Sequence, residues 1–331
     1  MLSENEIRPD AMRAEQARRF AEDIRRLNER KDEFVATPCP ACGADIPTVR
    51  FGKFGLTYVD CPSCGTLYVN PRPTPEILAW YYETSENYRY WNTFIFPASE
   101  GVRRERIFRP RVERLADICR RFGVPTRTLL EIGAGFGTFG EVVRESGLFD
   151  RYVAVEPTPD LAATCRKKGL EVIELPVERT ALPDSFADVV ASFEVIEHLF
   201  SPRAFIEASA RLLASGGLLI LSCPNARGFE VEVLQSASDT IDVEHLNYFN
   251  PASLSDLVAR CGFSVLETTT PGELDAELVR KKVLAGEADL GQEPFLKHVL
   301  VDEWDRLGEP FQKFLSANGL SSHLWLVARK S

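Results

Sequence analysis

The sequence predicts an α/β fold whose core is a doubly wound, mostly parallel sheet of seven strands, preceded by a small zinc-ribbon-like module. Short apolar runs alternate with helix-length segments from residue 129 onward, and a glycine-rich turn follows the first run. This alternation is typical of parallel sheets with helices on both faces. Two Cys-x-x-Cys-Gly turns, which begin at Cys39 and Cys61, predict the module.

Four segments are expected along the 331 residues. Residues 1–36 are a charged helix, 37–75 the cysteine module, 76–125 an aromatic helical connector that serves as a lid, and 126–331 the main domain. The main domain carries a helical insertion at about 273–318. Its predicted strands are 129–132, 152–155, 172–173, 188–192, 218–221, 264–266 and 324–327.

Composition excludes several classes of protein. The formal net charge of −10 makes nucleic acid an unfavoured partner, because phosphates attract clustered basic residues. No apolar run reaches the roughly 18 residues of a membrane span, and the first residues do not resemble a signal peptide. We therefore expect a cytoplasmic protein without membrane insertion. Nothing in the composition indicates the oligomeric state.

Four cysteines form two tight pairs, Cys39 with Cys42 and Cys61 with Cys64. Two such turns bring four thiolates around one tetrahedral Zn²⁺. Four sulfur ligands fill the coordination shell and leave no open position for catalysis. The pattern therefore predicts a structural zinc rather than a redox or catalytic site.

The glycine-rich turn carries Gly133, Gly135 and Gly137 between a predicted strand and a predicted helix. Glycines at this place let the backbone approach a ligand and leave the helix amides free to bind it. Because Gly135, Gly137 and Gly140 also satisfy G-x-G-x-x-G, the turn alone leaves a dinucleotide cofactor such as NAD open.

Two acids lie near the turn, of which Glu131 favours another ligand and Glu156 suits either cofactor. Glu131 lies in the first strand just before the turn, where a carboxylate suits a cationic group better than a pyrophosphate. Glu156 follows the second strand and can accept the hydroxyl hydrogens of a ribose. Both sit at carboxyl ends of strands, where an open α/β sheet binds its ligand.

Beyond the turn, the runs Leu182–Val190, Phe193–Leu199 and Arg211–Gly217 follow in order. With these motifs the chain resembles the class I S-adenosylmethionine-dependent methyltransferases, a superfamily with a Rossmann-like fold that includes ubiquinone-pathway O-methyltransferases. The resemblance implies S-adenosylmethionine as cofactor. It implies that Glu178 holds the adenine amino group where the family usually has Asp. The cofactor-binding set is then Glu131, Gly133, Gly135, Gly137, Glu156, Glu178, Phe193 and Glu194.

Methyl transfer to a hydroxyl often needs a general base. Of the four histidines, only His198 and His245 lie beside predicted strand ends. We predict His245 as a base, with Glu244 or Tyr248 assisting, and keep His198 as a further catalytic candidate. His245 as a residue that only orients its loop remains an alternative.

A second metal site is a further hypothesis. Glu194, Glu197 and His198 share one face if this segment turns helically. The string resembles the divalent-metal site of small-RNA 3′-end 2′-O-methyltransferases, where a downstream histidine, here His245, completes the shell. The resemblance implies Mg²⁺ or Mn²⁺. In the metal-free alternative, His198 caps a helix and Glu194 lies near the cofactor.

The cysteine module joined to this core resembles enzymes of sugar and cell-surface glycan biosynthesis. Sugar C-methyltransferases of that layout carry another α/β domain, for which this chain is too short. We therefore expect O-methylation of a sugar, a nucleotide-sugar or a glycan precursor. A metal-dependent RNA 2′-O-methyltransferase and a noncatalytic protein that only binds S-adenosylmethionine are the two alternatives.

Overall fold

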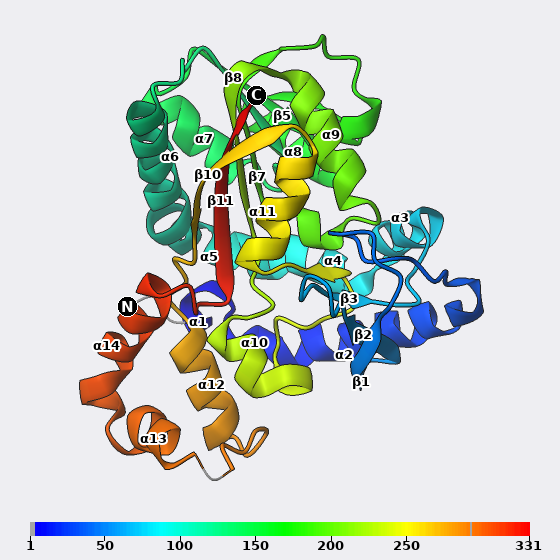
Figure 1. Ribbon diagram of the computed structural model, residues 1–331, viewed down its shortest axis with the longest axis vertical. Coiled ribbons are helices and arrows are strands. Elements are labelled where there is room, and N and C mark those ends of the chain that lie inside the picture. The colour runs from blue at the N-terminus through cyan, green and yellow to red at the C-terminus, as the bar shows by residue number, and fades with distance from the viewer. Residues whose placement is uncertain (1–3, 292) are drawn as a thin grey trace.

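The computed structural model describes residues 4–291 and 293–331, and its largest element is a seven-stranded sheet with the order β10-β11-β8-β7-β4-β5-β6 (Figure 1). The five strands from β4 to β8 pair in parallel, whereas β11 runs antiparallel to both β8 and β10. The strands are β4 (Thr128–Ile132), β5 (Arg151–Val155), β6 (Glu171–Ile173), β7 (Ala187–Phe193), β8 (Leu213–Pro224), β10 (Phe263–Thr269) and β11 (His323–Lys330).

Each predicted apolar run lies within a strand, and the prediction of a doubly wound, mostly parallel sheet is confirmed. The chain winds outward from β4 through β5 to β6, then returns to β7 on the other side of β4. This reversal leaves a crevice at the carboxyl ends of β4 and β7, where sheets of this kind bind ligands.

Side chains alternate across the strands, so each face of the sheet has its own core. Leu129 and Val189 pack with α6 (Arg109–Phe122) and α7 (Thr138–Ser146) on one face. Leu130 and Val190 pack with α9 (Pro202–Leu212) and α11 (Pro251–Arg260) on the other. Ala154 packs against α8 (Pro159–Lys167). The glycine turn between β4 and α7 is thereby held between two packed layers.

The small sheet has the order β1-β2-β3-β9. Its first three strands come from the cysteine segment, but β9 (Asn247–Tyr248) belongs to the loop between β8 and α11. Sequence analysis did not predict β9. Pairing of β3 with β9 therefore joins the cysteine segment to the main domain. The strands of the cysteine segment are β1 (Thr48–Lys53), β2 (Leu56–Asp60) and β3 (Leu67–Val69).

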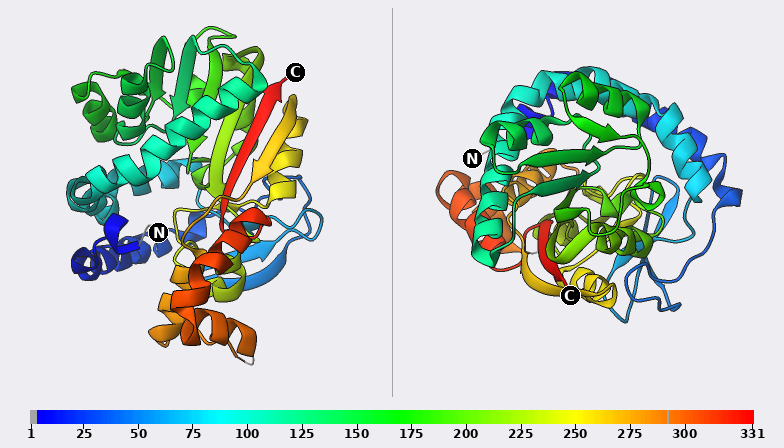
Figure 2. Two further views of the ribbon diagram at one scale, coloured as in Figure 1. Left: turned by 90° about the vertical axis from the view of Figure 1, so that its left-hand side faces the viewer. Right: turned by 90° about the horizontal axis from the view of Figure 1, so that it is seen from above.

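The aromatic connector is helical throughout. It comprises α3 (Pro75–Thr84), α4 (Glu86–Tyr90), α5 (Phe96–Arg103) and two π-helical turns, η2 (Trp91–Ile95) and η3 (Arg104–Phe108), which run into α6. Seen from above, these helices form an arc around the sheet (Figure 2). Their arc brings aromatic side chains over the carboxyl edge of β4.

The remaining helices lie below that edge (Figure 1). The insertion between β10 and β11 contains α12, α13, the π-helical turn η7 and α14, which share a core with α10. No helix among the described residues is both long enough and apolar enough to span a membrane. The bounds are α1 (Glu4–Ile7), α2 (Asp10–Asn28), α10 (Phe229–Leu234), α12 (Asp275–Leu284), α13 (Pro294–Lys297), η7 (His298–Asp302) and α14 (Trp304–Ala317).

Candidate active site

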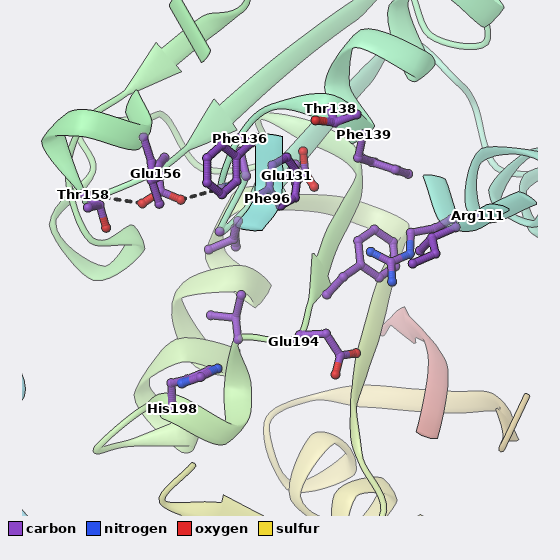
Figure 3. Close-up of a pocket in the computed structure, with 18 of the residues that line it drawn as sticks. Phe96, Arg111, Glu131, Phe136, Thr138, Phe139, Glu156, Thr158, Glu194 and His198 are labelled. Carbon is purple, nitrogen blue, oxygen red and sulfur yellow. Dashed lines mark hydrogen bonds between the residues drawn. The ribbon is translucent and has the colours of Figure 1, made fainter. Parts of the chain in front are cut away.

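A cavity of about 1310 Å³ opens at the carboxyl ends of β4, β5 and β7. The glycine turn forms one wall, and the connector and the insertion form the others (Figure 3). Single-ligand pockets span roughly 300–1,000 Å³, so this cavity has room for a cofactor and an acceptor together.

The glycine turn requires glycine at two positions. Gly133 has φ +81°, and a Cβ there would lie 2.3 Å from Cγ2 of Val195. Gly137 has φ +71°, and its Cβ would lie 2.9 Å from Sγ of Cys165. Both a left-handed backbone and a close neighbour exclude other residues. The turn can therefore pass close to a ligand without side chains in the way.

Glu156 is 4% exposed and anchors the turn. One carboxylate oxygen accepts the N–H of Gly135 at 2.8 Å and the other accepts the N–H of Thr158 at 2.9 Å (Figure 3). Burial raises the pKa of this carboxyl group, although the two hydrogen bonds lower it. Each ionised oxygen can accept a further hydrogen bond, as the predicted contact with ribose hydroxyls needs.

Glu131 is 3% exposed at the end of β4, and the hydroxyl of Tyr152 donates to its carboxylate. Burial raises the pKa of Glu131 to about 7, although the Tyr152 hydrogen bond and the charge of Arg111 lower it. A carboxyl group with this pKa can lose its proton when a cation enters the cavity. That behaviour suits the predicted ammonium partner.

Of the other predicted cofactor residues, Glu178, Phe193 and Glu194 also line the cavity, whereas Gly137 is not among the lining residues. Glu178 lies in a 3₁₀ turn, Val177–Arg179, with its side chain exposed. Phe193 is 7% exposed, and the Arg111 guanidinium carbon lies 4.3 Å from its ring centroid. Across the glycine turn, Phe96 of the connector stacks on Phe136 with ring centroids 3.7 Å apart.

Glu194 does not share a helical face with Glu197 and His198. It has φ +56° directly after β7, and the 3₁₀ turn Ile196–His198 begins only beyond it. Its Oε1 instead accepts from the hydroxyl of Ser222 at 2.5 Å and lies 2.9 Å from Nε2 of His323. Burial alone would raise the pKa of Glu194, but His323, Ser222 and Arg111 together hold it far below its usual value.

Three of the four predicted catalytic residues, His245, Glu244 and Tyr248, are not among the residues that line the cavity, whereas His198 is. Tyr248 is fully buried, and its hydroxyl donates to the carbonyl of Thr240 at 3.3 Å. Burial raises the pKa of Glu244 to about 8. These catalytic roles remain predictions.

Glu197, His198 and His245 form a group whose ligand atoms lie within 4.8 Å of one another. Glu197 is fully buried, and among the described residues neither carboxylate oxygen has a hydrogen-bond partner. Nδ1 of His198 lies 3.0 Å from the Tyr82 hydroxyl, and Nδ1 of His245 lies 2.9 Å from the Thr240 carbonyl. That carbonyl only accepts, so Nδ1 of His245 carries the proton and Nε2 is free to bind a cation.

The four module cysteines are also brought together, with every sulfur within 4.8 Å of the others. Sγ of Cys39 lies 3.6 Å from that of Cys64, and Sγ of Cys42 lies 3.5 Å from that of Cys61. Tetrahedral Zn–S bonds of about 2.3 Å place sulfurs about 3.8 Å apart, so the group fits one zinc ion. The two turns repeat one hydrogen-bond pattern, from the N–H of the glycine to the carbonyl of the first cysteine.

A family model described as a methyltransferase domain matches residues 102–268, which include β4 to β8, the glycine turn and most of the cavity wall. The chain belongs to this methyltransferase-domain family. The prediction of a class I S-adenosylmethionine-dependent methyltransferase, made from the motifs, is thereby confirmed at the level of family and fold.

Among curated relatives, a Mycobacterium tuberculosis protein named a probable S-adenosylmethionine-dependent methyltransferase is 31% identical over 154 residues, covering 46% of this chain and 52% of its own. The ubiquinone biosynthesis O-methyltransferase of Xylella fastidiosa is 31% identical over 119 residues, covering 34% and 48%. The chain thus spans about half the length of the curated relatives it matches. A solved S-adenosylmethionine-dependent methyltransferase of Archaeoglobus fulgidus is 20% identical, with a TM-score of 0.45 over 66% of this chain and 94% of that one.

Two observations of the methyltransferase domain fit its family's cofactor. A side chain at Gly133 or Gly137 would collide with its neighbours, which keeps the turn bare. The buried carboxyl groups of Glu131 and Glu156 both line the cavity beside it. Sequence analysis missed Arg111 and His323 as lining residues. Residues that follow parallel strands can be found from the carboxyl ends of those strands, but His323 is the first residue of an antiparallel strand.

Proposed function

We propose that the protein transfers a methyl group from S-adenosylmethionine to a hydroxyl of a sugar, a nucleotide-sugar or a glycan precursor. The observation that carries the proposal is a single cavity lined by the glycine turn, by Glu131, Glu156 and Glu178, and by aromatic and arginine side chains. The cofactor supplies a methyl group on a positively charged sulfur. The residues of this chain hold that group and position an acceptor.

Several residues have suitable chemistry for the cofactor. Glu156 would accept the ribose hydroxyls, Glu178 the adenine amino group, and Glu131 the α-ammonium. Arg111 would receive the α-carboxylate, because its guanidinium has no hydrogen-bond partner among the described residues and lies near Glu131. An ammonium on one side and a carboxylate on the other would fix the amino acid portion of the cofactor.

The acceptor side of the cavity supports a sugar with an anionic group. Tyr82, Tyr88, Trp91 and Phe108 supply flat apolar surface, and arginines of the connector and α6 face the same space. Arginine binds phosphate through paired N–H groups, and aromatic faces cover the apolar side of a ring. Besides Arg111, which is assigned to the cofactor, these arginines are Arg103, Arg106 and Arg114.

The proposal is tested by binding and by transfer. Calorimetry is expected to show binding of S-adenosylhomocysteine and no binding of NADH. Tritiated S-adenosylmethionine is then incubated with a polar-metabolite extract, with and without EDTA, and the labelled product is identified. NADH binding in place of S-adenosylhomocysteine contradicts the proposal. Cofactor binding without transfer to any extract component favours the noncatalytic alternative.

One observation favours a metal-dependent enzyme, such as an RNA 2′-O-methyltransferase, as the second candidate. The buried Glu197 carboxylate has no hydrogen-bond partner in the described chain, and His198 and His245 lie beside it. Mg²⁺ or Mn²⁺ held there would lower the pKa of an acceptor hydroxyl. Loss of transfer in EDTA and labelling of RNA ends would support this candidate. Transfer to sugars in EDTA excludes it.

We also propose that Cys39, Cys42, Cys61 and Cys64 hold a structural zinc ion. The segment of residues 37–75 is then a metal-stabilised module, 76–125 a connector that covers the cavity, and 126–331 the catalytic domain with its insertion. Sulfur spacing and the repeated turn geometry support the zinc site.

A further inference from the structure

We propose that His323 is the general base of methyl transfer, oriented by Glu194. The inference deepens the proposed function and rests on it. His323 belongs to none of the predicted site motifs. It is the first residue of β11 and pairs with Pro224, the last residue of β8. Because β11 runs antiparallel to β8, its first residue reaches the same edge as the ends of the parallel strands. His323 therefore lines the cavity.

The contact with Glu194 determines which ring nitrogen is free. Oε1 of Glu194 lies 2.9 Å from Nε2 of His323. Ser222 donates a second hydrogen bond to the same oxygen. Against desolvation, the charge and hydrogen bond of His323, the Ser222 hydroxyl and Arg111 lower the pKa of Glu194, so its carboxylate is ionised and can only accept. Nε2 of His323 therefore carries the proton. In the neutral ring, Nδ1 then has a free lone pair, which is the tautomer that a base requires.

The backbone at Glu194 is built for this contact. A φ of +56° is uncommon for a residue other than glycine. The N–H of Glu194 donates to the carbonyl of Ser222 at 3.0 Å, which ties the turn to β8. Left-handed residues of this kind concentrate at functional sites. Here the conformation turns the Glu194 side chain towards β11 and away from His198 (Figure 3).

The cavity geometry is consistent with transfer at this edge. The side chain of His323 is 31% exposed and that of Glu194 is 42% exposed. As the acceptor oxygen attacks the methyl carbon, the C–O bond forms, the C–S bond breaks, and the sulfonium becomes a neutral thioether. Nδ1 of His323 takes the hydroxyl proton, the Glu194 carboxylate stabilises the resulting imidazolium, and the proton later passes to water.

The first test compares His323→Ala with His298→Ala, a matched change at an exposed histidine of the insertion. Initial rates are measured with tritiated S-adenosylmethionine and the polar-metabolite extract, and affinity with S-adenosylhomocysteine. We expect His323→Ala to lose roughly 10²–10⁴-fold in rate while keeping the affinity within about threefold, and added imidazole to restore part of the rate. His298→Ala is expected to match the wild type. A His323→Ala rate within about threefold of wild type overturns the proposal. Loss of transfer in His245→Ala, with His323→Ala active, would assign the base to His245 instead.

A second measurement needs no acceptor, so it separates this inference from the proposed function. With only four histidines, ¹⁵N-histidine NMR spectra can be assigned by single substitutions. At pH 8, His323 is expected to show the Nε2–H tautomer, and Glu194→Gln to disturb that state. A His323 ring with its proton on Nδ1 contradicts the inference even if the wild type methylates nothing in the extract. Absence of transfer by the wild type, with the expected tautomer present, counts only against the proposed function.

Discussion

At the scale of single residues, burial sets the chemistry of the cavity acids. Glu131 and Glu194 lie at the ends of neighbouring strands, β4 and β7, but they differ in protonation. Glu131 keeps a pKa near neutrality because burial outweighs its partners, whereas His323, Ser222 and Arg111 hold the pKa of the more exposed Glu194 low. One carboxyl group is thus free to respond to a bound cation, and the other is held as a permanent anion.

The pKa of Glu131, about 7, predicts proton-linked binding of S-adenosylhomocysteine. The ammonium of the ligand needs the ionised carboxylate, so binding below pH 7 must displace a proton. Affinity is therefore expected to fall as pH falls, by up to about tenfold per pH unit and about 50-fold between pH 7 and pH 5. Calorimetry in buffers of different ionisation enthalpy measures the released proton.

The matched ligand is 5′-methylthioadenosine, which lacks the amino acid portion. Its affinity is expected to change little over the same pH range. Glu131→Gln is expected to weaken S-adenosylhomocysteine binding and to flatten its pH dependence. Equal pH dependence for the two ligands contradicts the assigned role of Glu131.

At the scale of elements, short segments become rigid through partners far away in sequence. The stacked rings of Phe96 and Phe136 join the connector to the glycine turn. Both cysteine turns are irregular: the first precedes β1, and the second lies between β2 and β3, which are short strands of the small sheet. Because the module has little secondary structure, it makes few internal contacts. Small modules of this kind are usually stabilised by a bound metal ion.

Removal of one zinc ligand is expected to destabilise the module. Cys61→Ser should lower the bound zinc, measured by elemental analysis, and reduce the free energy of unfolding by on the order of 3 kcal/mol or more. Cys261→Ser is the matched control, because Cys261 follows α11 and lies outside the four-sulfur group. Unchanged zinc content and stability in Cys61→Ser exclude the site.

At the scale of the whole molecule, the cysteine module and the methyltransferase domain share one sheet and one buried polar network. Asn247 of β9 is fully buried and accepts from Nη1 of Arg72 at 3.1 Å. Its Nδ2 donates to the carbonyls of Glu197 and Leu199. The loop that carries His198 is thus tied through Asn247 to Arg72 of the cysteine module, so we expect both parts to unfold together.

Asn247→Ala is expected to lower the free energy of unfolding by about 2–4 kcal/mol, because it leaves the buried Arg72 guanidinium and the carbonyls of Ile196, Glu197 and Leu199 without this partner. Chemical denaturation followed by tyrosine and tryptophan fluorescence measures the loss. Asn318→Ala removes an exposed amide that bonds only the Phe314 carbonyl, so its effect is expected to be below about 0.5 kcal/mol. Similar losses for the two variants contradict the role of the network.

Features that depend on neighbours along the chain can be predicted from the residues alone. Apolar runs place the strands, the paired cysteines mark the module, and Gly133 and Gly137 mark the turn, because strand alternation, thiolate spacing and left-handed backbone are local requirements. The tertiary structure alone decided what depends on distant partners: the pairing of β9 with β3, the direction of the Glu194 side chain, and the arrival of His323 beside it. After the long insertion, the antiparallel strand β11 starts at the edge of the sheet where the parallel strands end. No local sequence pattern around His323 indicates that it starts there.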